Sequence, residues 1–468
     1  MCFKSGFSTA LLALWLSSTV AADRQPQIDL SEERSLRSEP VDITIKGLEP
    51  WTRVTVQLST TFNDGYFDDG RYVSEAHFQS GADGSVEILK QAPLGGDYQG
   101  IDPFGLFWSL ARAKQTAEAD GNMETAETDA DEADPAALTE PRQYELSILV
   151  DGEVLATRTL ERVAVKSGVT TRRLNDGRLR GVLWLPPGDG PHPAFVVLSG
   201  SGGGYPNVAA QQLVNRGYAA LSLAYFGAAD LPENIIEIPL EYFIEGIDWL
   251  ADQPEVDPDR LGVQGRSRGG ELALLLASIE PRLKAVLAWV PSHVVWSGCC
   301  IEAAMSQSAW SLDGAPLSFA GTNQIAYDRF MYWHDMIVDN EIAIGEFFWL
   351  SMADETAVNA AAIEVERIQG AIMMISGGRD EMWPASYMAD QVVARLNEHN
   401  FEYPHVHVTF DEAGHALHVF PDTPMDHRLL AAYPDSPLLY RMGGTPAAMA
   451  WTPHEAWRLI EQFFDEHL

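Results

Sequence analysis

The sequence contains very little cysteine: three residues among 468, one of which is Cys2. So few cysteines exclude a disulfide-stapled framework, and the adjacent Cys299 and Cys300 lack the spacing of a zinc site. The adjacent pair leaves two interpretations, a strained vicinal disulfide or two buried thiols. We expect buried thiols, because free cysteine packs as a small hydrophobic residue.

Basic residues are also scarce relative to acidic ones. The chain has 31 Lys and Arg against 67 Asp and Glu, which gives a net charge of −36. Such a surface repels nucleic acid and anionic membranes, so neither is expected as a partner. It would also repel a polyanionic small molecule unless arginines compensate locally. The alternative interpretation of the charge is an adaptation for solubility.

Long hydrophobic runs are absent after the N-terminus, where one short run occurs. Lys4 precedes an apolar stretch that ends at Val20, and the small residues Ala21 and Ala22 follow. This pattern is typical of a secretory signal peptide, and the stretch is short for a membrane span. We therefore predict a signal peptide over residues 1–22 and an exported protein without stable membrane insertion. An uncleaved N-terminal anchor is the alternative.

The length favours two domains, and the first has the pattern of strands. Within residues 27–166, apolar and polar residues alternate over β-branched runs, and Asp151-Gly152 between two such runs indicates a hairpin. We predict an all-β, immunoglobulin-like sandwich. Residues 115–141 contain no Lys, Arg or aromatic residue and are rich in acids, which predicts a disordered loop. The acids could suggest calcium, but they lack regularly spaced ligands with glycine.

The second domain, predicted over residues 167–468, alternates short apolar strands with amphipathic helices. This pattern predicts an α/β fold, with a mostly parallel sheet and helices on both faces. Thr452, Pro453 and Glu455 have the pattern of a capping box at the start of the last helix. The aromatic-rich segment 291–364 interrupts the alternation. It is either a cap that lines an apolar pocket or an insert with its own core.

A five-residue turn in this domain has the pattern of a nucleophile elbow. Gly265-Arg266-Ser267-Arg268-Gly269 matches G-x-S-x-G, follows an apolar strand and opens a helix. The motif alone is a weak signal, and an ordinary glycine-rich turn is the alternative. The strand–turn–helix context favours Ser267 as a nucleophile, because the helix N-terminus favours developing negative charge.

A nucleophilic serine needs a base and an acid that orients the base. Asp380 follows one buried strand and His415 follows the last strand, so both are expected at the same sheet edge as Ser267. The order Ser, Asp, His is that of α/β hydrolases. We prefer Asp380 to its neighbour Glu381 because it is nearer the strand end, and His415 to His418 because Gly precedes it.

An oxyanion formed during acyl transfer needs two N–H donors. The backbone of Arg268 directly follows the candidate nucleophile, and Ser201 or Gly202 lies in a glycine-rich loop after an early strand. That loop is not followed by G-K-[ST] and does not contain G-x-G-x-x-G, so nucleotide binding is not expected. We predict neither a cofactor nor a metal site.

Three side chains are candidates for contact with a substrate: Arg266, Trp310 and Trp383. Arg266 and Arg268 are either solvated surface charges or guanidinium groups that hold an anionic ligand beside the elbow. Trp310 belongs to the aromatic-rich segment, where aromatic residues are core residues by default.

Several long blocks resemble the acyl-CoA thioesterase / bile acid-CoA:amino acid N-acyltransferase family, in the same order. They include "PLGGDYQGIDPFGLFWSL", "LWLPPGDGPHPAFVVLSGSGGG", "GGELALLLAS", "ISGGRDEMWP", "AGHALHVFP" and "GGTPAAMAWTPHEAW", and span nearly the whole mature chain. The resemblance implies an N-terminal β-sandwich followed by an α/β-hydrolase domain. It also implies that Ser267, Asp380 and His415 form the triad.

The resemblance implies an activity as well. Members with a cysteine nucleophile tend toward amide formation with glycine or taurine, whereas those with serine tend to be thioesterases. Ser267 therefore favours hydrolysis of an acyl thioester through an acyl-serine. The predicted export signal points to a carboxylesterase as one alternative, and an amino acid N-acyltransferase is a second. A secreted binding protein without catalysis is a third.

Overall fold

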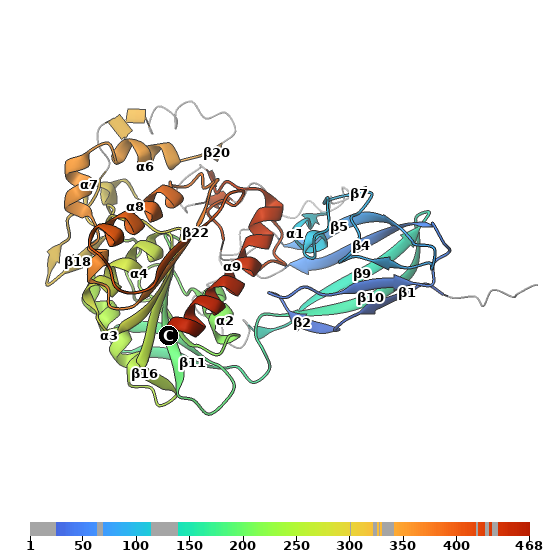
Figure 1. The fold of residues 1–468 in the computed structure, drawn as a ribbon, viewed down its shortest axis with the longest axis horizontal. Helices are drawn as coiled ribbons and strands as arrows, with labels where there is room; N and C mark the ends of the chain where they lie inside the picture. The colour runs from blue at the N-terminus through green and yellow to red at the C-terminus, as the bar shows by residue number, and fades with distance from the viewer. Residues whose placement is uncertain are drawn as a thin grey trace, which may run out of the picture.

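The computed structural model shows a β-rich part and an α/β part side by side (Figure 1). It describes residues 25–62, 69–113, 139–299, 301–321, 325–326, 328–329, 341–417, 420–425, 430–432 and 439–468. The predicted signal peptide lies outside the described residues, as does almost all of the predicted acidic loop.

Two sheets form the β-rich part, and their inward-facing residues make its core. Along β4 (Arg53–Phe62), for example, Val54, Val56 and Leu58 are buried in alternation with more exposed neighbours. The Asp151-Gly152 turn joins β9 (Arg142–Val150) to β10 (Glu153–Val163) with positive φ at both residues, which confirms the predicted hairpin. The three-stranded sheet has the order β1 (Gln27–Leu30), β3 (Ile43–Lys46), β6 (Val86–Glu87). The larger sheet has the order β2 (Arg34–Leu36), β10 (Glu153–Val163), β9 (Arg142–Val150), β4 (Arg53–Phe62), β5 (Gly70–Gln79), β7 (Gly95–Gly96), with β8 (Ala111–Arg112) also paired to β5.

An eight-stranded sheet forms the centre of the second part. Its first two strands are antiparallel to their neighbours, and the other six run parallel to one another. The order is β11 (Thr170–Asp176), β12 (Leu179–Leu185), β14 (Ala219–Ala224), β13 (His192–Leu198), β16 (Val256–Arg266), β17 (Leu283–Trp289), β21 (Ala371–Gly377), β22 (His405–Phe410). The carboxyl ends of the six parallel strands therefore meet at one edge of the sheet.

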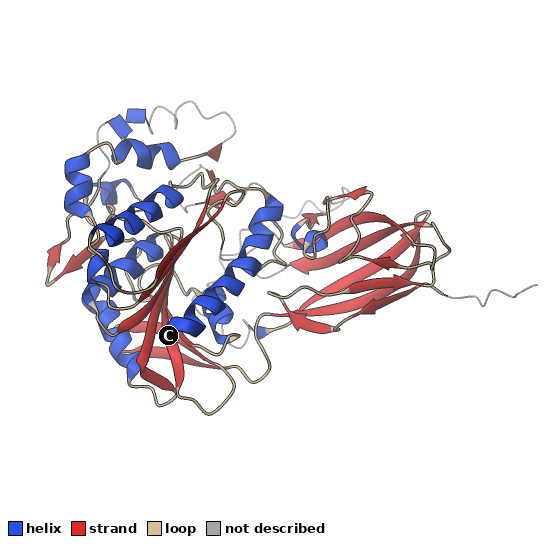
Figure 2. Ribbon diagram, viewed as in Figure 1, coloured by secondary structure: helices blue, strands red, loops and turns tan. Residues whose placement is uncertain are grey.

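Helices cover both faces of this sheet (Figure 2). Along β13, Val196 and Leu198 pack into one apolar core, and Phe195 and Val197 pack into the other. Helices α3 (Leu240–Ala251) and α4 (Arg268–Ile279) contribute to the first core, and α2 (Asn207–Val214) and α9 (Pro446–His467) to the second. Helix α8 (Ala385–Glu398) covers the end of the sheet near β21. The predicted α/β-hydrolase fold is confirmed.

The aromatic-rich segment forms short elements beyond the end of the sheet (Figure 1). Strand β18 (Trp310–Leu312) pairs with β15 (Ile238–Pro239) and with β19 (Ala315–Pro316). Its helical elements include η2 (Glu302–Ser306), α6 (Gly345–Ser351) and α7 (Glu355–Ala361), and η3 (Val365–Arg367) follows the segment. Strand β20 (Glu341–Ile342) pairs with β24 (Leu439–Arg441), which pairs with β23 (Leu430–Ala432).

The last helix begins earlier than the predicted capping box at Thr452. Thr445 is its N-cap, its side chain accepts a hydrogen bond from Ala448 N at 3.3 Å, and Pro446 occupies the first turn. Pro453 therefore lies inside the helix. The sequence repeats Thr-Pro at both places, and local pattern alone did not separate the real cap from the internal copy.

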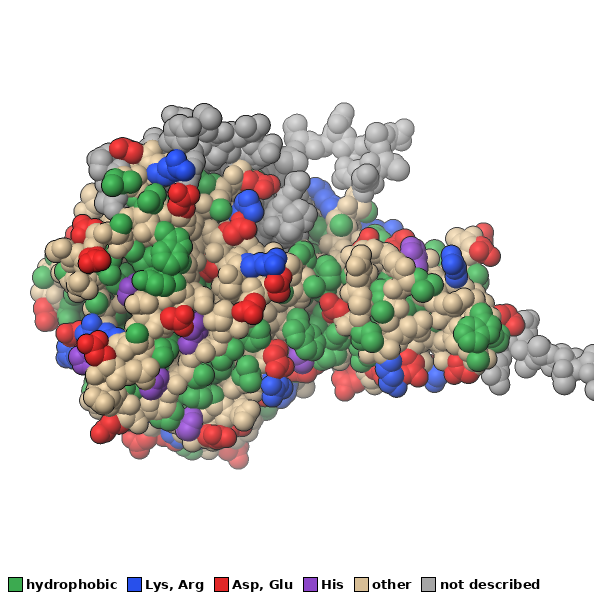
Figure 3. Space-filling model, turned by 45° about the horizontal axis from the view of Figure 1, so that its top comes forward, with side chains coloured by type: hydrophobic (Ala, Val, Ile, Leu, Met, Phe, Trp, Pro, Cys, Tyr) green, Lys and Arg blue, Asp and Glu red, His purple; other side chains and the backbone are tan. Residues whose placement is uncertain are grey.

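The expectation of buried thiols is wrong for Cys299, which is disulfide-bonded. The other two cysteines lie outside the described residues. Within the described part of the chain, no helix has both the length and the apolar character needed to cross a membrane. Figure 3 shows acidic side chains scattered over one face of both parts, with basic side chains between them.

Candidate active site

Ser267 lies at the sharp turn between β16 and α4, where it is the N-cap residue of the helix. Its backbone has φ 57° and ψ −120°, a conformation that costs energy for a residue with a side chain. Glycine is required on both sides: a Cβ on Gly265 would lie 1.9 Å from Gly269 O, and one on Gly269 would lie 2.3 Å from Ser199 O. The close packing of strand, turn and helix holds Ser267 at the end of α4, as the predicted elbow requires.

His415 and Asp380 are joined by a hydrogen bond of 2.8 Å between Nδ1 and Oδ2. Both side chains are buried. An ionised carboxylate can only accept, so this contact selects the tautomer of a neutral imidazole that carries its proton on Nδ1. The other Asp380 oxygen accepts from Met382 N at 2.9 Å and from Trp383 N at 3.1 Å, which fixes the carboxylate. The pair is therefore held in the form that a general base needs.

The sheet brings these residues to one edge. Ser267 follows β16, Asp380 follows β21 and His415 follows β22, and these strands are parallel. The end of β17 forms hydrogen bonds with the elbow and with the loop that carries Asp380. Trp289 O accepts from Ser267 N at 2.9 Å, and Val290 O accepts from the indole N–H of Trp383 at 3.1 Å. Strand β17 thus ties the elbow to the loop that carries Asp380.

The rivals considered for the acid and base are placed differently. Glu381 pairs with Arg441 at 2.7 Å near the surface. His407 lies on β22, and its Nδ1 contacts Asp390 at 2.8 Å. His418 lies outside the described residues. Of the described alternatives, neither Glu381 nor His407 takes part in the hydrogen bond between Asp380 and His415.

The candidate oxyanion donors lie on α4 and on the glycine-rich loop after β13. Arg268 is the first residue of α4, so its N–H has no acceptor within the helix. In the glycine-rich loop, a Cβ on Gly200 would lie 3.3 Å from Ser267 Cβ. Gly203 N and Gly204 N donate to other carbonyl oxygens, at 3.2 and 3.0 Å. Ser201 and Gly202 therefore remain the candidates for the second donor.

The two arginines of the elbow have different environments. Arg268 is buried: Nη1 lies 3.1 Å from Glu271 Oε2, and Nη2 donates to Ser297 O at 3.0 Å. It is neither a solvated charge nor a group at an open ligand site, so both interpretations of its side chain are wrong. Arg266 is half-buried, and its guanidinium lies close to Gly200 beside the elbow. Arg266 keeps its place as a candidate contact for an anionic ligand.

Glu271 is a buried acid that sequence reasoning missed. It accepts hydrogen bonds from the Trp310 indole N–H at 2.8 Å and from Trp296 N at 3.2 Å. Burial raises the pKa of Glu271 to about 7, and Arg268 opposes that shift. The sequence signal that could have identified Glu271 is an acidic residue within an otherwise apolar helix, four positions after Ser267.

Trp310 is a core residue and does not lie at a substrate-binding surface, contrary to the prediction from the sequence. Its side chain is fully buried and packs in the core near Tyr225 and Phe243. Its N–H is used by Glu271. Of the two interpretations of segment 291–364, a cap that lines a pocket or an insert with its own core, Trp310 fits the second.

A series of aromatic contacts links His415 to segment 291–364. The Trp383 ring lies 5.9 Å from the His415 ring, and Phe348 of α6 lies 5.6 Å from Trp383. Trp296 extends the contact, 4.9 Å from Phe348. Trp383 is itself fully buried and its indole N–H donates to Val290 O, so, like Trp310, it lies in the core and not at the predicted substrate surface.

Within the described residues, His, Cys, Asp and Glu do not form a group of three or more that could hold a metal ion. The structure joins Asp380 and His415 by a hydrogen bond and places Ser267 at the same sheet edge. The hydrogen bonds of the described residues do not include one between Ser267 and His415.

Two sequence models of one family match most of the chain. One is described as "Acyl-CoA thioester hydrolase/BAAT N-terminal region" and matches residues 38–176. The other is described as "BAAT / Acyl-CoA thioester hydrolase C terminal" and matches residues 238–468.

Similar curated proteins cover nearly the same length. Acyl-coenzyme A thioesterase 1 of Homo sapiens is 29% identical over 441 residues, which are 92% of this chain and 94% of that protein. Acyl-coenzyme A amino acid N-acyltransferase 1 of Mus musculus is 30% identical over 437 residues, 93% of this chain and 96% of that protein. Bile acid-CoA:amino acid N-acyltransferase of Homo sapiens is 28% identical over 446 residues, 94% and 98% of the two chains.

Proposed function

Because the chain belongs to the family of acyl-CoA thioester hydrolases and bile acid-CoA:amino acid N-acyltransferases, we propose that it hydrolyses acyl thioesters through an acyl-enzyme on Ser267. The observation that carries the proposal is the buried hydrogen bond of 2.8 Å between His415 Nδ1 and Asp380 Oδ2. It orients the imidazole at the sheet edge where Ser267 emerges.

In the proposed reaction, the Ser267 hydroxyl attacks the thioester carbonyl while His415 Nε2 takes its proton. The N–H of Arg268, with that of Ser201 or Gly202, stabilises the oxyanion of the tetrahedral intermediate. Collapse breaks the carbon–sulfur bond, and the imidazolium gives its proton to the thiolate. Water then attacks the acyl-serine with His415 as base, and the carboxylic acid leaves.

The acyl group is proposed to be a medium or long chain. Support comes from Phe348, a half-buried ring that lies 5.6 Å from Trp383, the ring 5.9 Å from His415. An alkyl chain gains free energy from contact with such rings, because apolar surface is removed from water.

Serine as the nucleophile supports hydrolysis over amide formation. The relatives include thioesterases and N-acyltransferases, which differ in whether water or an amino acid accepts the acyl group. An acyltransferase would release an amide of glycine or taurine in place of the free acid.

A carboxylesterase is the second candidate, and the charge of the protein favours it. The net charge of −36 opposes a ligand with the phosphates of CoA. Around Asp380, the exposed Arg379 and Arg441 are paired with Glu412 and Glu381, at 2.9 and 2.7 Å. The proposed export signal over residues 1–22 also favours esters other than those of CoA.

One side-by-side assay tests these functions. The purified enzyme is given acyl-CoA esters and p-nitrophenyl esters of the same chain lengths, with and without glycine or taurine. We expect thiol release from acyl-CoA with free acid as product, and its loss in Ser267→Ala. Ester hydrolysis far above any thioester hydrolysis would select the carboxylesterase, and an amide product would select the acyltransferase.

A further inference from the structure

A carboxylate from the segment that follows His415 is buried among residues of the β-sandwich. Asp422, seven positions after His415, has a fully buried side chain. Its Oδ1 accepts a hydrogen bond of 2.8 Å from Arg37 Nε, and its Oδ2 lies 3.6 Å from Arg162 Nε. Arg37 and Arg162 belong to the sandwich, so one acid of the hydrolase domain lies between two cations of the other domain.

The sandwich holds Arg162 rigidly. Arg162 lies on β10, its side chain is fully buried, and Nη1 donates to Ser35 Oγ at 2.7 Å. Nη2 donates to Glu39 O at 2.6 Å, and the guanidinium lies 5.1 Å from the Phe107 ring. A buried guanidinium with this many fixed partners cannot follow a moving loop, so Asp422 meets a rigid cation.

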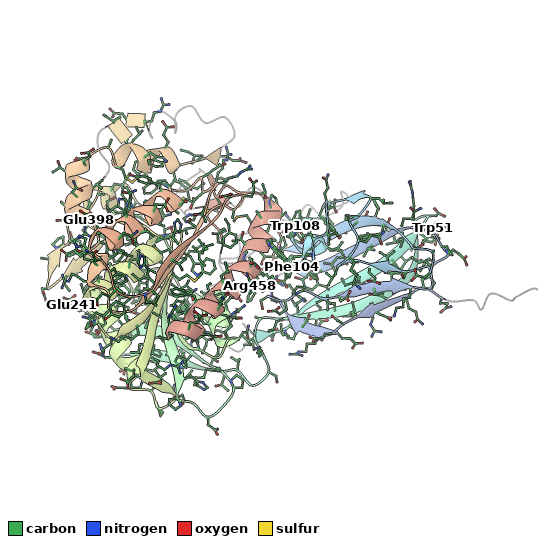
Figure 4. All side chains as sticks on the ribbon, viewed as in Figure 1. Trp51, Phe104, Trp108, Glu241, Glu398 and Arg458 are labelled. Carbon is green, nitrogen blue, oxygen red and sulfur yellow. The ribbon has the colours of Figure 1, made fainter. Side chains whose placement is uncertain are left out.

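Other contacts bind the same segment to the sandwich. Met425 N donates to Trp108 O at 2.8 Å, and the Tyr144 hydroxyl donates to Asp422 O at 3.4 Å. The guanidinium of Arg37 lies 4.4 Å from the Phe420 ring. Figure 4 places Trp108 at the junction of the two parts, beside α9.

The described contacts also hold the chain close to His415 itself. His415 N donates to Met442 O at 2.8 Å, and Leu417 N donates to His415 O at 3.1 Å. On the hydrolase side, Asp380 thus fixes the imidazole of His415 and Met442 fixes its backbone. Residues 420–425, further along the same connection, are fixed by the sandwich.

We propose that the β-sandwich positions the catalytic base: Arg37 and Arg162 clamp Asp422 and thereby fix the loop that carries His415. The proposal rests on the proposed function of His415. Catalytic groups must be held within about 0.5 Å of the productive geometry, and a long connection between strands does not supply this alone. In this account Asp422, Arg37 and Arg162 are positioning residues, and the sandwich completes the enzyme without contacting the substrate.

Kinetic measurements distinguish a positioning role of the Asp422 cluster from a purely structural one. If the cluster only joined the two domains, its loss would lower thermal stability and leave the rate per folded enzyme unchanged. If it positions His415, its loss lowers kcat with little change in KM and alters the pH profile of kcat/KM, in which the base titrates.

The test uses Arg37→Gln and Asp422→Asn in the full chain, with rates normalised to active sites titrated by a fluorophosphonate. Arg37 is 14% exposed, which makes its variant the one better able to fold. The matched control is His454→Ala, which removes a different contact between the domains: His454 Nδ1 lies 3.1 Å from Ser38 O. Arg37→Lys is the rescue variant, because it keeps the charge.

We expect both variants to lower kcat about tenfold or more while KM changes less than about twofold, and Arg37→Lys to recover part of the loss. The control should lower stability alone. Folded Arg37→Gln and Asp422→Asn enzymes with the kcat and pH profile of the parent, or with losses equal to the control, would overturn the proposal.

The same experiment distinguishes failure of the proposed thioesterase activity from failure of the positioning proposal. Acyl-CoA and p-nitrophenyl esters are both measured for the parent and Ser267→Ala. If the parent hydrolyses only the ester, thioester hydrolysis is contradicted, and the ester rates of the variants test whether Asp422 and its arginines position His415. If the parent hydrolyses neither, the rate of fluorophosphonate labelling at Ser267 tests the clamp, because that step also depends on His415.

Discussion

The guanidinium of Arg268 lies 3.1 Å from the carboxylate of Glu271, and both side chains are buried beneath the nucleophile elbow. Arg268 also donates to Ser297 O, and Glu271 accepts from Trp310. The pair therefore joins the helix behind Ser267 to the segment that follows β17. Arg268 therefore supports the backbone on which Ser267 lies and does not bind a ligand through its side chain.

Glu271 should make stability depend on pH between about 4.5 and 7. Its pKa is raised to about 7 by burial, above the ordinary value of 4.5. Between these values the folded state binds the proton and the unfolded state does not, so the free energy of unfolding falls as the pH rises. The full shift corresponds to about 3 kcal/mol. We expect Glu271→Gln to flatten this part of the pH–stability curve, measured by urea unfolding.

His293 should have the opposite dependence at lower pH. Burial lowers its pKa to about 4, from an ordinary value of 6.5. The unfolded state then binds the proton first, so stability is complete above about pH 6.5 and decreases as the pH falls toward 4, by about 3 kcal/mol. His293→Asn should reduce that decrease, measured by urea unfolding over this pH range. Equal acid dependence in the parent and His293→Asn would contradict the assignment.

The elbow should not tolerate a methyl group at Gly269. A Cβ there would lie 2.3 Å from Ser199 O and 2.7 Å from Leu198 O, both backbone atoms. We expect Gly269→Ala to lower the free energy of unfolding by at least about 2 kcal/mol, because overpacking displaces the backbone. Gly202→Ala is the stability control, since a Cβ there meets nothing within 4 Å. A Gly269→Ala protein as stable as the control would show that the turn is looser than described.

Asp380→Asn should lower kcat about 10⁴-fold while preserving the fold. An amide can donate to the imidazole, which would place the proton on the wrong nitrogen of His415. Glu381→Gln is the matched control: Glu381 is the next residue and forms a surface ion pair of 2.7 Å with Arg441. Its loss should change kcat less than about threefold, because exposed pairs contribute little. Comparable kcat values for the two variants would contradict the choice of Asp380.

Local sequence pattern predicted the fold class and placed Ser267, Asp380 and His415 at strand ends, because strand and turn signals lie within a few residues. It could not predict that Arg268 faces inward, since that depends on Glu271 and on a segment about thirty positions away. The core position of Trp310 and the contact of Asp422 with Arg37 depend on folding in the same way. Such contacts join residues far apart in sequence, and no periodicity marks them.

The most direct test of the account is detection of the acyl-enzyme itself. The parent is mixed with dodecanoyl-CoA, quenched within its first turnover and digested, and the peptide that contains Ser267 is weighed by mass spectrometry. We predict a burst of free thiol with one acyl mass on that peptide, and neither in Ser267→Ala. Undiminished thiol release by folded Ser267→Ala, or an acyl group on another residue of the parent, would contradict the account.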